Sequence, residues 1–391
     1  MKSKRSICIL LCLSLLLVTF TGCASRNDNP FHDDDPAQTP PGSSGAAPGD
    51  HDHGDDCDHP LGIDFEAAIS AFPPDTVMFS SAAGTITWAE LFVFLFRTVS
   101  NIYYSYGGEF DWSDEFYGDI SLSRFVLEYS TDEASSFLAF AYGIDANNFS
   151  LSNDLLSEFT NDLNELIDAY GGREELTLSL RENAGFYSLE VFEKLYKLEY
   201  TAHHLLNYLY GEEFSSFPDE LVAKYAEENG YMMAMHILRL KIDGDDTPLA
   251  ESEEILAELN NHRDSDDLHD VFFDLMNLHS EDGGLASSPN GYLFQFSDMV
   301  EPFSAAAASL EIGQMSDIVE TVYGYHIILK IPIDYDAIPT GFAWEGIHQT
   351  LRQAAAYADF DKQMLSWLDS LKITFTAEFD SIDLAAIFKF C

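Results

Sequence analysis

The hydrophobic positions along the chain follow two different periods. Between about residues 73 and 230, apolar side chains recur at three- and four-residue intervals over long stretches, a pattern that predicts amphipathic helices. Thr87 and Glu90 have the spacing of a capping box and mark the start of the first helix. We expect helices at 88–102, 121–140, 155–170, 186–210 and 218–229, with a short hairpin within 77–86.

From about residue 231 to 332 the segments become shorter and change type. The pattern predicts a strand, two helices, a strand, a short helix and two final strands. His236 and His326 each open an aliphatic run that is typical of a strand, and Pro248 and Pro302 stand where the first and the short helix begin. This alternation predicts an α+β module with a small antiparallel sheet covered by helices. Beyond it we expect a helix at 344–371 and strands at 372–377 and 382–388.

The first residues have the pattern of a targeting segment. Lys2, Lys4 and Arg5 precede an apolar run at 7–20, and a Thr-Gly pair then precedes Cys23. We expect 1–22 to be a bacterial lipoprotein signal peptide, which would place a lipid anchor on Cys23 and the rest of the chain outside the cytoplasm. An ordinary signal peptide or an uncleaved membrane anchor is the alternative, because the apolar run is short for a membrane span.

The cysteines provide no disulfide framework. Cys8 and Cys12 would leave with the signal peptide and Cys23 would carry lipid, so that only Cys57 and Cys391 remain.

A polar tract of 23–61 follows the signal. It is rich in Asp, Pro, Gly and Ser and has few large apolar residues, so burial would not offset the entropy of ordering it, and we expect a disordered acidic tether. Within it, the run 51–59 contains His, Asp and Cys side chains of the kind that bind zinc. Their spacing matches no closed tetrahedral site. A solvated tether is therefore the favoured interpretation, and metal binding stays open.

The charge balance restricts the partners of the chain. Of its 391 residues, 19 are Lys or Arg and 67 are Asp or Glu, giving a formal net charge of -48. Such a charge repels phosphate backbones and anionic head groups, and it excludes nucleic acid as an expected partner. The length suggests two or three domains, and a hydrophobic content of 46% is sufficient for buried cores.

Four short segments carry a resemblance to a known family. Their sequences are AMHILRL, LHSED, SDMVEPF and TVYGYHIILKI, in this order, between residues 234 and 331. They resemble the parvulin family of peptidyl-prolyl cis/trans isomerases, in the branch of bacterial foldase lipoproteins of PrsA type and periplasmic chaperones of SurA type. The resemblance implies a parvulin module at 231–332 that is inserted in, or appended to, a mainly helical SurA-like chaperone domain. That domain would comprise 73–230, with the C-terminal helix and strands of 340–391 packed on it.

The resemblance also implies roles for seven residues and no cofactor or metal. An apolar slot would hold the proline ring, a histidine pair with a hydroxyl partner would shape it, and a carboxylate would lie beside the substrate carbonyl. Substrate-binding residues would be Phe294, Met299 and Phe303, and catalytic residues His236, Asp282, Thr321 and His326.

The chain departs from the family at two places, the segment 289–292 and Tyr323, which stands where some parvulins have serine. Residues 289–292 read Pro-Asn-Gly-Tyr, where the family often has Gly-Asp-Leu-Gly. The leucine that forms one wall of the pocket in the family is therefore missing here.

Few basic residues that could bind a phosphorylated substrate lie near His236. The loop after His236 offers only Arg239 and Lys241 before three aspartates. Non-phosphorylated polypeptide is therefore the expected substrate.

Three functional hypotheses result. The first is an extracytoplasmic, lipid-anchored foldase that isomerises X-Pro bonds in unfolded secreted polypeptides, has chaperone activity, contacts the membrane only through its anchor and forms a possible homodimer. The second is a holdase chaperone with a degenerate parvulin module, because binding and catalysis would use the same pocket. The third is a metal- or solute-capturing lipoprotein, supported by the signal and the tract at 51–59 alone.

Overall fold

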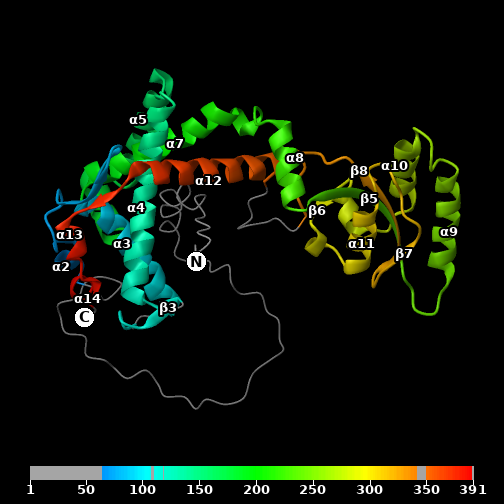
Figure 1. Cartoon of the computed structure of the whole chain (residues 1–391), viewed down its shortest axis with the longest axis horizontal. Helices are drawn as coiled ribbons and strands as arrows, with labels where there is room; N and C mark the ends of the chain where they lie inside the picture. The colour runs from blue at the N-terminus through cyan, green and yellow to red at the C-terminus, as the bar shows by residue number, and fades with distance from the viewer. Residues whose placement is uncertain (1–63, 107–109, 118, 341–348, 390–391) are drawn as a thin grey trace, which may run out of the picture. The chain divides into compact units, whose positions relative to one another are not determined.

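The computed structural model describes residues 64–106, 110–117, 119–340 and 349–389. The chain divides into two compact units. Unit 1 takes the described residues up to Leu206 and from Phe360 onward, and unit 2 comprises Asn207–Asp359. The chain therefore leaves unit 1, forms unit 2 and returns to unit 1 (Figure 1).

Unit 1 is mainly helical, as the three- and four-residue periodicity predicts. A small sheet accompanies the helices: β1 pairs antiparallel with β2 and, on its other side, with β9 from the end of the chain. A separate short hairpin joins β3 and β4. The elements are α2 Phe65–Ile69, β1 Val77–Ser81, β2 Gly84–Thr87, α3 Trp88–Tyr106, β3 Glu115–Tyr117, β4 Ile120–Ser121, α4 Leu122–Ala146, α5 Asn153–Ala169, α6 Arg173–Ala184, α7 Leu189–Tyr210, α12 Leu351–Leu371, β9 Thr374–Phe375, α13 Ala377–Asp380 and α14 Leu384–Ile387. The last residues of α7 and the first residues of α12 belong to unit 2.

The start of α3 shows how local sequence sets a boundary. The backbone N–H of Thr87 donates to Oε2 of Glu90 at 2.8 Å, which is the reach-back expected from a capping box. The other oxygen of Glu90 forms an ion pair with Lys194 of α7. Glu90 therefore stabilises the start of α3 through its bond to Thr87 and connects α3 to α7 through its ion pair with Lys194.

Three features of unit 1 differ from the sequence predictions. Helix α6 was not expected, because only Leu176 and Leu180 of this segment are buried and its apolar stripe is narrow. The hairpin of β3 and β4 was also missed, since its strands are only two and three residues long. The strand predicted at 382–388 is wrong: the side chain of Asp383 accepts from Ala386 N and caps the helical turn α14 instead.

Unit 2 contains a four-stranded antiparallel sheet with the order β6-β5-β8-β7. This confirms the predicted succession of strands and helices and the α+β class. The two long central strands pair along their whole length, from Met233 opposite Ile331 to Leu240 opposite Gly324. The elements are α8 Asp219–Glu228, β5 Met232–Leu240, α9 Thr247–Asn260, α10 Leu268–His279, β6 Tyr292–Phe294, α11 Glu301–Ser309, β7 Val319–Glu320 and β8 Gly324–Ile331, with 3-10 turns η1 Glu212–Phe214, η2 Gly283–Ala286 and η3 Phe296–Asp298.

The two faces of this sheet are covered by different helices (Figure 1). Phe303 and Ala307 of α11 pack on Ala234 and Ile328 of the central strands. On the opposite face, Met233 and Met235 lie next to side chains of α10. Because successive residues of a strand alternate between faces, His236 belongs to the α11 face together with Ala234.

Unit 2 extends beyond the predicted module of 231–332 at both ends. Arg352, at the start of α12, donates to the backbone oxygen of Phe217 and forms ion pairs with Asp219 and Asp336 at 2.7 and 2.8 Å. These contacts tie the segments before and after the sheet to each other within unit 2. The residue limits of the predicted domains stay a prediction.

Several predictions fall outside the described residues: the signal peptide of 1–22, the lipidation of Cys23, the tether of 23–61 with its tract at 51–59, and the first residues of the helix predicted from 344. Over the described ranges, no helix combines the length and the apolar character needed to span a bilayer.

Candidate functional site

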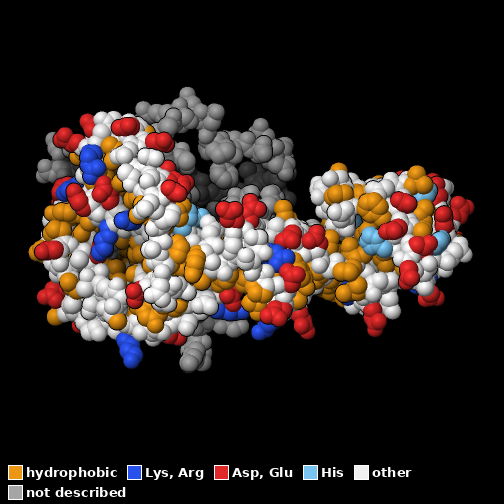
Figure 2. Space-filling model, turned by 90° about the horizontal axis from the view of Figure 1, so that it is seen from above, with side chains coloured by type: hydrophobic (Ala, Val, Ile, Leu, Met, Phe, Trp, Pro, Cys, Tyr) orange, Lys and Arg blue, Asp and Glu red, His pale blue; other side chains and the backbone are white. Residues whose placement is uncertain are grey.

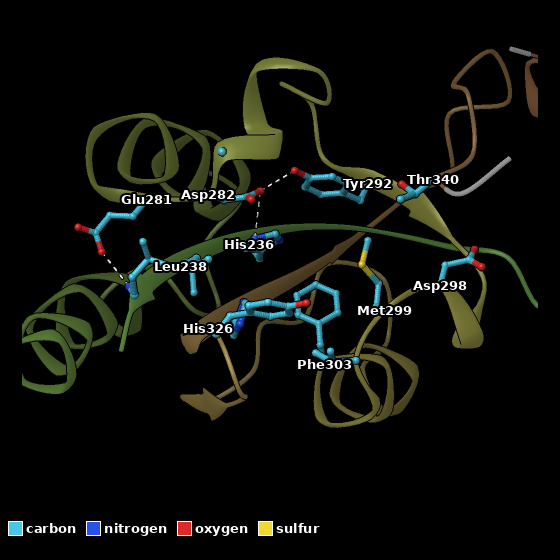
Figure 3. A pocket seen from close by; sticks show the side chains of 14 residues that line it. His236, Leu238, Glu281, Asp282, Tyr292, Asp298, Met299, Phe303, His326 and Thr340 are labelled. Carbon is cyan, nitrogen blue, oxygen red and sulfur yellow. Dashed lines mark hydrogen bonds and ion pairs between the residues drawn. The ribbon is translucent and has the colours of Figure 1, made fainter. Parts of the chain in front are cut away.

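A pocket of about 500 Å³ opens on the α11 face of the sheet in unit 2 (Figure 3). Strands β5 and β8 form its floor, and the segments around η2, β6 and η3 form its rim. Its lining comprises His236, Leu238, Leu240, Glu281, Asp282, Gly283, Tyr292, Asp298, Met299, Val300, Phe303, Tyr323, His326 and Thr340. Five of the seven site residues predicted from the sequence are in this set, and Thr321 and Phe294 are not.

The two predicted histidines lie side by side at the base of the pocket. His326 of β8 lies opposite Leu238 of β5. His236 is two residues before Leu238 and therefore lies on the same face of the sheet as His326. The centroids of the His236 and His326 rings are 5.3 Å apart. Nε2 of His326 shares a hydrogen bond of 2.9 Å with Oγ1 of Thr321, which is buried behind the pocket wall. The predicted hydroxyl partner is thus placed next to the histidine pair.

Both histidines are held in the neutral form. Burial lowers the pKa of His236, and nearby Asp282 opposes this only in part. Burial and the neighbouring His236 lower the pKa of His326 to about 4. In the part of the chain that the structure describes, Nδ1 of each ring has no hydrogen-bond partner. Two neutral rings on adjacent strands are suited to shaping a cavity rather than to carrying charge.

Asp282 enters the pocket from the rim and is fixed by three neighbours. Its Oδ1 accepts from Gly284 N at 3.1 Å, and its Oδ2 accepts from the hydroxyl of Tyr292 at 2.5 Å. The same Oδ2 lies 3.4 Å from Nε2 of His236. Burial and this bond to Asp282 raise the pKa of the Tyr292 hydroxyl well above its usual range. A carboxylate with a set position therefore faces the cavity between Tyr292 and His236 (Figure 3).

The apolar wall is made by two of the three residues expected there. Phe303 contacts both histidine rings edge-on, at centroid distances of 5.1 and 5.4 Å, and Met299 lies above it. Phe294 is fully buried in the core against Phe303, with 5.7 Å between the centroids, and does not line the pocket. Phe294 therefore supports the wall from behind instead of forming a third side of it.

Sequence reasoning missed the role of Tyr292. This residue stands in the segment that departs from the family pattern, and there it was interpreted only as the loss of a leucine wall. Its ring stacks on that of His236 at 5.4 Å and 21°, and its hydroxyl reaches Asp282. The signal that was present is the alternation of β6, which places Tyr292 on the same face as the buried Phe294.

Comparisons with known proteins match this part of the chain. Residues 236–331 match the family described as the PPIC-type PPIASE domain. A stretch of 103 residues is 34% identical to a foldase protein, PrsA 3, of Bacillus cereus. The aligned stretch covers 26% of this chain and 32% of that protein, so the match extends over about a third of this relative.

Solved structures of similar proteins were also found. A peptidylprolyl isomerase (PrsA) from Bacillus cereus has 20% identity, covers 69% of this chain and 96% of that chain, and gives a TM-score of 0.30. PrsA from Bacillus subtilis has 20% identity, covers 76% of this chain and 92% of that chain, and gives a TM-score of 0.24. Both TM-scores are below 0.5.

Proposed function

We propose that the chain, whose residues 236–331 match the PPIC-type PPIASE domain, catalyses cis/trans isomerisation of X-Pro bonds in unfolded secreted polypeptides. The observation that carries the proposal is one cavity in which Met299 and Phe303 form an apolar wall and Asp282 presents a fixed carboxylate. A proline ring fits an apolar slot, and the peptide bond before it would then pass the carboxylate.

The chemistry requires no covalent intermediate. Rotation about an X-Pro bond breaks amide resonance and meets a barrier of roughly 18–20 kcal/mol. In the planar amide the carbonyl oxygen carries extra electron density, and part of this density is lost as the bond twists. A carboxylate beside that oxygen repels it more in the planar state than in the twisted one, and a repulsion that weakens in the transition state lowers the barrier. Asp282 is the group we assign to this role.

The remaining site residues act on the shape of the cavity. His236, His326 and Thr321 are buried, hydrogen-bonded or stacked around Phe303, and hold no charge near neutral pH. We assign them to positioning, with Phe294 behind the wall. Proton transfer is not part of the proposal, because bond rotation neither gains nor loses a proton.

The setting of the activity is likewise a proposal. The signal pattern at 1–22 and Cys23 supports a lipid-anchored protein on the extracytoplasmic face of a bacterial membrane. The helical unit 1 would serve as a chaperone domain for the same clients, alone or in a homodimer. If the module binds peptide without turnover, the holdase alternative replaces catalysis.

Met299→Ala is expected to reduce the catalysed exchange rate about tenfold. The substitution removes most of the apolar contact above Phe303, and an apolar side chain of this size contributes roughly 1.5 kcal/mol to binding a ring. Exchange NMR on the signals of a short Ala-Pro peptide, with the full-length chain, measures the rate. Leu278→Ala is the matched control, since Leu278 is 72% exposed on α10 and does not line the pocket.

Two results would count against the proposed wall. Equal losses in both variants would show a general effect on stability. Full activity of Met299→Ala would show that the substrate proline does not bind against Met299.

A further inference from the structure

The charged side chains that line the pocket are all acidic. Its lining includes the carboxylates of Glu281, Asp282 and Asp298 and contains neither Lys nor Arg. In Figure 3 Glu281 and Asp298 lie at opposite ends of the cavity, and Asp282 lies between them. A polypeptide that crosses the cavity would therefore meet a carboxylate on each side of its proline.

Nearby cations do not cancel this charge. Arg239 forms ion pairs with both Glu251 and Glu281, so one guanidinium is shared between two carboxylates. Lys241 is paired with Glu320. Both histidines of the pocket are neutral near pH 7, as shown above. Carboxylates thus outnumber positive charges around the cavity.

The acidic ends of the pocket remain accessible to a ligand. Asp298 is exposed, and its Oδ2 accepts from Gln295 N at 2.7 Å within a turn of the backbone. The side chain of Glu281 is 39% exposed, and its Oε2 accepts from Leu240 N at 2.8 Å. These bonds hold the carboxylates at the rim without covering them. On the face seen in Figure 2, acidic side chains are also spread over the surface of the protein.

We propose that this pocket selects prolines flanked by lysine or arginine. The inference deepens the proposed isomerase function and rests on it. An ammonium or guanidinium group next to the proline would approach Glu281 or Asp298, whereas an acidic or phosphorylated neighbour would be repelled. Exposed ion pairs of this kind change affinity roughly three- to fivefold per pair. The substrates favoured are unfolded polypeptides in which basic residues adjoin proline.

A peptide series tests the preference. Tetrapeptides with Arg, Ala or Glu immediately before proline, and a second set with these residues immediately after it, are compared by exchange NMR with the full-length chain. At low ionic strength we expect the catalysed exchange rate to be highest for the Arg peptide, lower for the Ala peptide and lowest for the Glu peptide. The rates of the Arg and Glu peptides should differ roughly tenfold. At 0.5 M NaCl the ratio should fall towards one, because salt screens exposed charges.

Variants assign the effect to the rim. In the double variant Glu281→Gln with Asp298→Asn, both amides keep the hydrogen-bond acceptor and lose the charge, and the Arg-to-Glu ratio is expected to drop below about threefold. Glu253→Gln removes an exposed carboxylate of α9 outside the pocket and should leave the ratio as it is in the unaltered chain.

Each outcome decides the inference. Equal rates for Arg, Ala and Glu peptides, with all of them accelerated, would overturn the charge preference and keep the isomerase. If no peptide is accelerated, the proposed function fails, and chemical-shift titrations of the same peptides then decide the preference from their affinities. A ratio that persists in the double variant would move the selectivity away from Glu281 and Asp298.

Discussion

The Asp282→Asn variant is expected to isomerise an Ala-Pro peptide about 10²-fold more slowly than the unaltered chain. One preorganised electrostatic group in an active site contributes roughly this factor to a rate. The substitution keeps the shape of the side chain, removes its charge and replaces one of its two acceptor oxygens by an amide donor. Because the Asp282 side chain is only 19% exposed, solvent screens that charge weakly. Exchange NMR with the full-length chain measures the loss.

Two further variants separate charge from position. Tyr292→Phe removes the hydroxyl that fixes Oδ2 of Asp282 and leaves the carboxylate in place. We expect a loss of at least roughly tenfold, because a hydrogen bond to a charged group contributes about 1.5 kcal/mol or more. Glu281→Gln removes the adjacent negative charge and should cost less than about threefold for this neutral peptide. Full activity of Asp282→Asn would remove the carboxylate from the mechanism.

Glu199→Gln is expected to stabilise unit 1 at pH 8 by about 3–5 kcal/mol and to change little at pH 4.5. Glu199 lies on α7, is only 5% exposed, and neither of its carboxyl oxygens has a hydrogen-bond partner among the described residues. Burial raises its pKa to about 8, and Arg97 opposes this only in part, since Arg97 is already paired with the buried Glu133 at 2.7 Å.

The sign of the pH dependence follows from the two pKa values. The raised pKa keeps Glu199 protonated up to about pH 8 in the folded protein, whereas in the unfolded chain it ionises near the ordinary glutamate pKa of 4.5. Its contribution to stability is therefore complete below pH 4.5 and is lost as pH rises to about 8. Glutamine does not ionise, so the difference between variant and unaltered chain grows over this window.

Urea unfolding followed by tryptophan fluorescence measures this difference, because three of the four tryptophans, Trp88, Trp112 and Trp367, belong to unit 1. Glu165→Gln, which removes an exposed carboxyl of α5, is the control and should change stability by less than about 0.5 kcal/mol at either pH. A stability difference for Glu199→Gln that is the same at pH 4.5 and pH 8 would contradict the assignment of a protonated buried carboxyl.

The sequence predicts the elements of the candidate site better than its contacts. His236 and His326 open aliphatic runs, and the runs are strands. That the two rings lie on one face depends on the pairing of Leu238 with His326, which is a register that periodicity alone does not define. The bond between Tyr292 and Asp282 was not predicted either, because it joins a turn to a strand in a segment that departs from the family pattern.

In unit 1, helix prediction succeeded where apolar residues recur at helical spacing and failed where they do not. Helix α5 buries only two of its seventeen residues but was predicted from its three- and four-residue periodicity, whereas the leucines of α6 stand at alternate positions, 176, 178 and 180, and gave no helical signal. The turn α14 shows a different cause. Leu384, Ile387 and Phe388 are buried at helical spacing, but over so few residues the cap supplied by Asp383 decides between helix and strand.

The route of the chain through its two units has a consequence for synthesis. Phe79 of β1 pairs with Phe375 of β9, so a contact within unit 1 spans the whole of unit 2. A chain that emerges from its N-terminus, from a ribosome or through a membrane, presents every strand of the isomerase sheet before β1 can acquire its second neighbour. Since closing long loops is slow, unit 1 is completed last, and unit 2 is the first of the two units whose native contacts can all form.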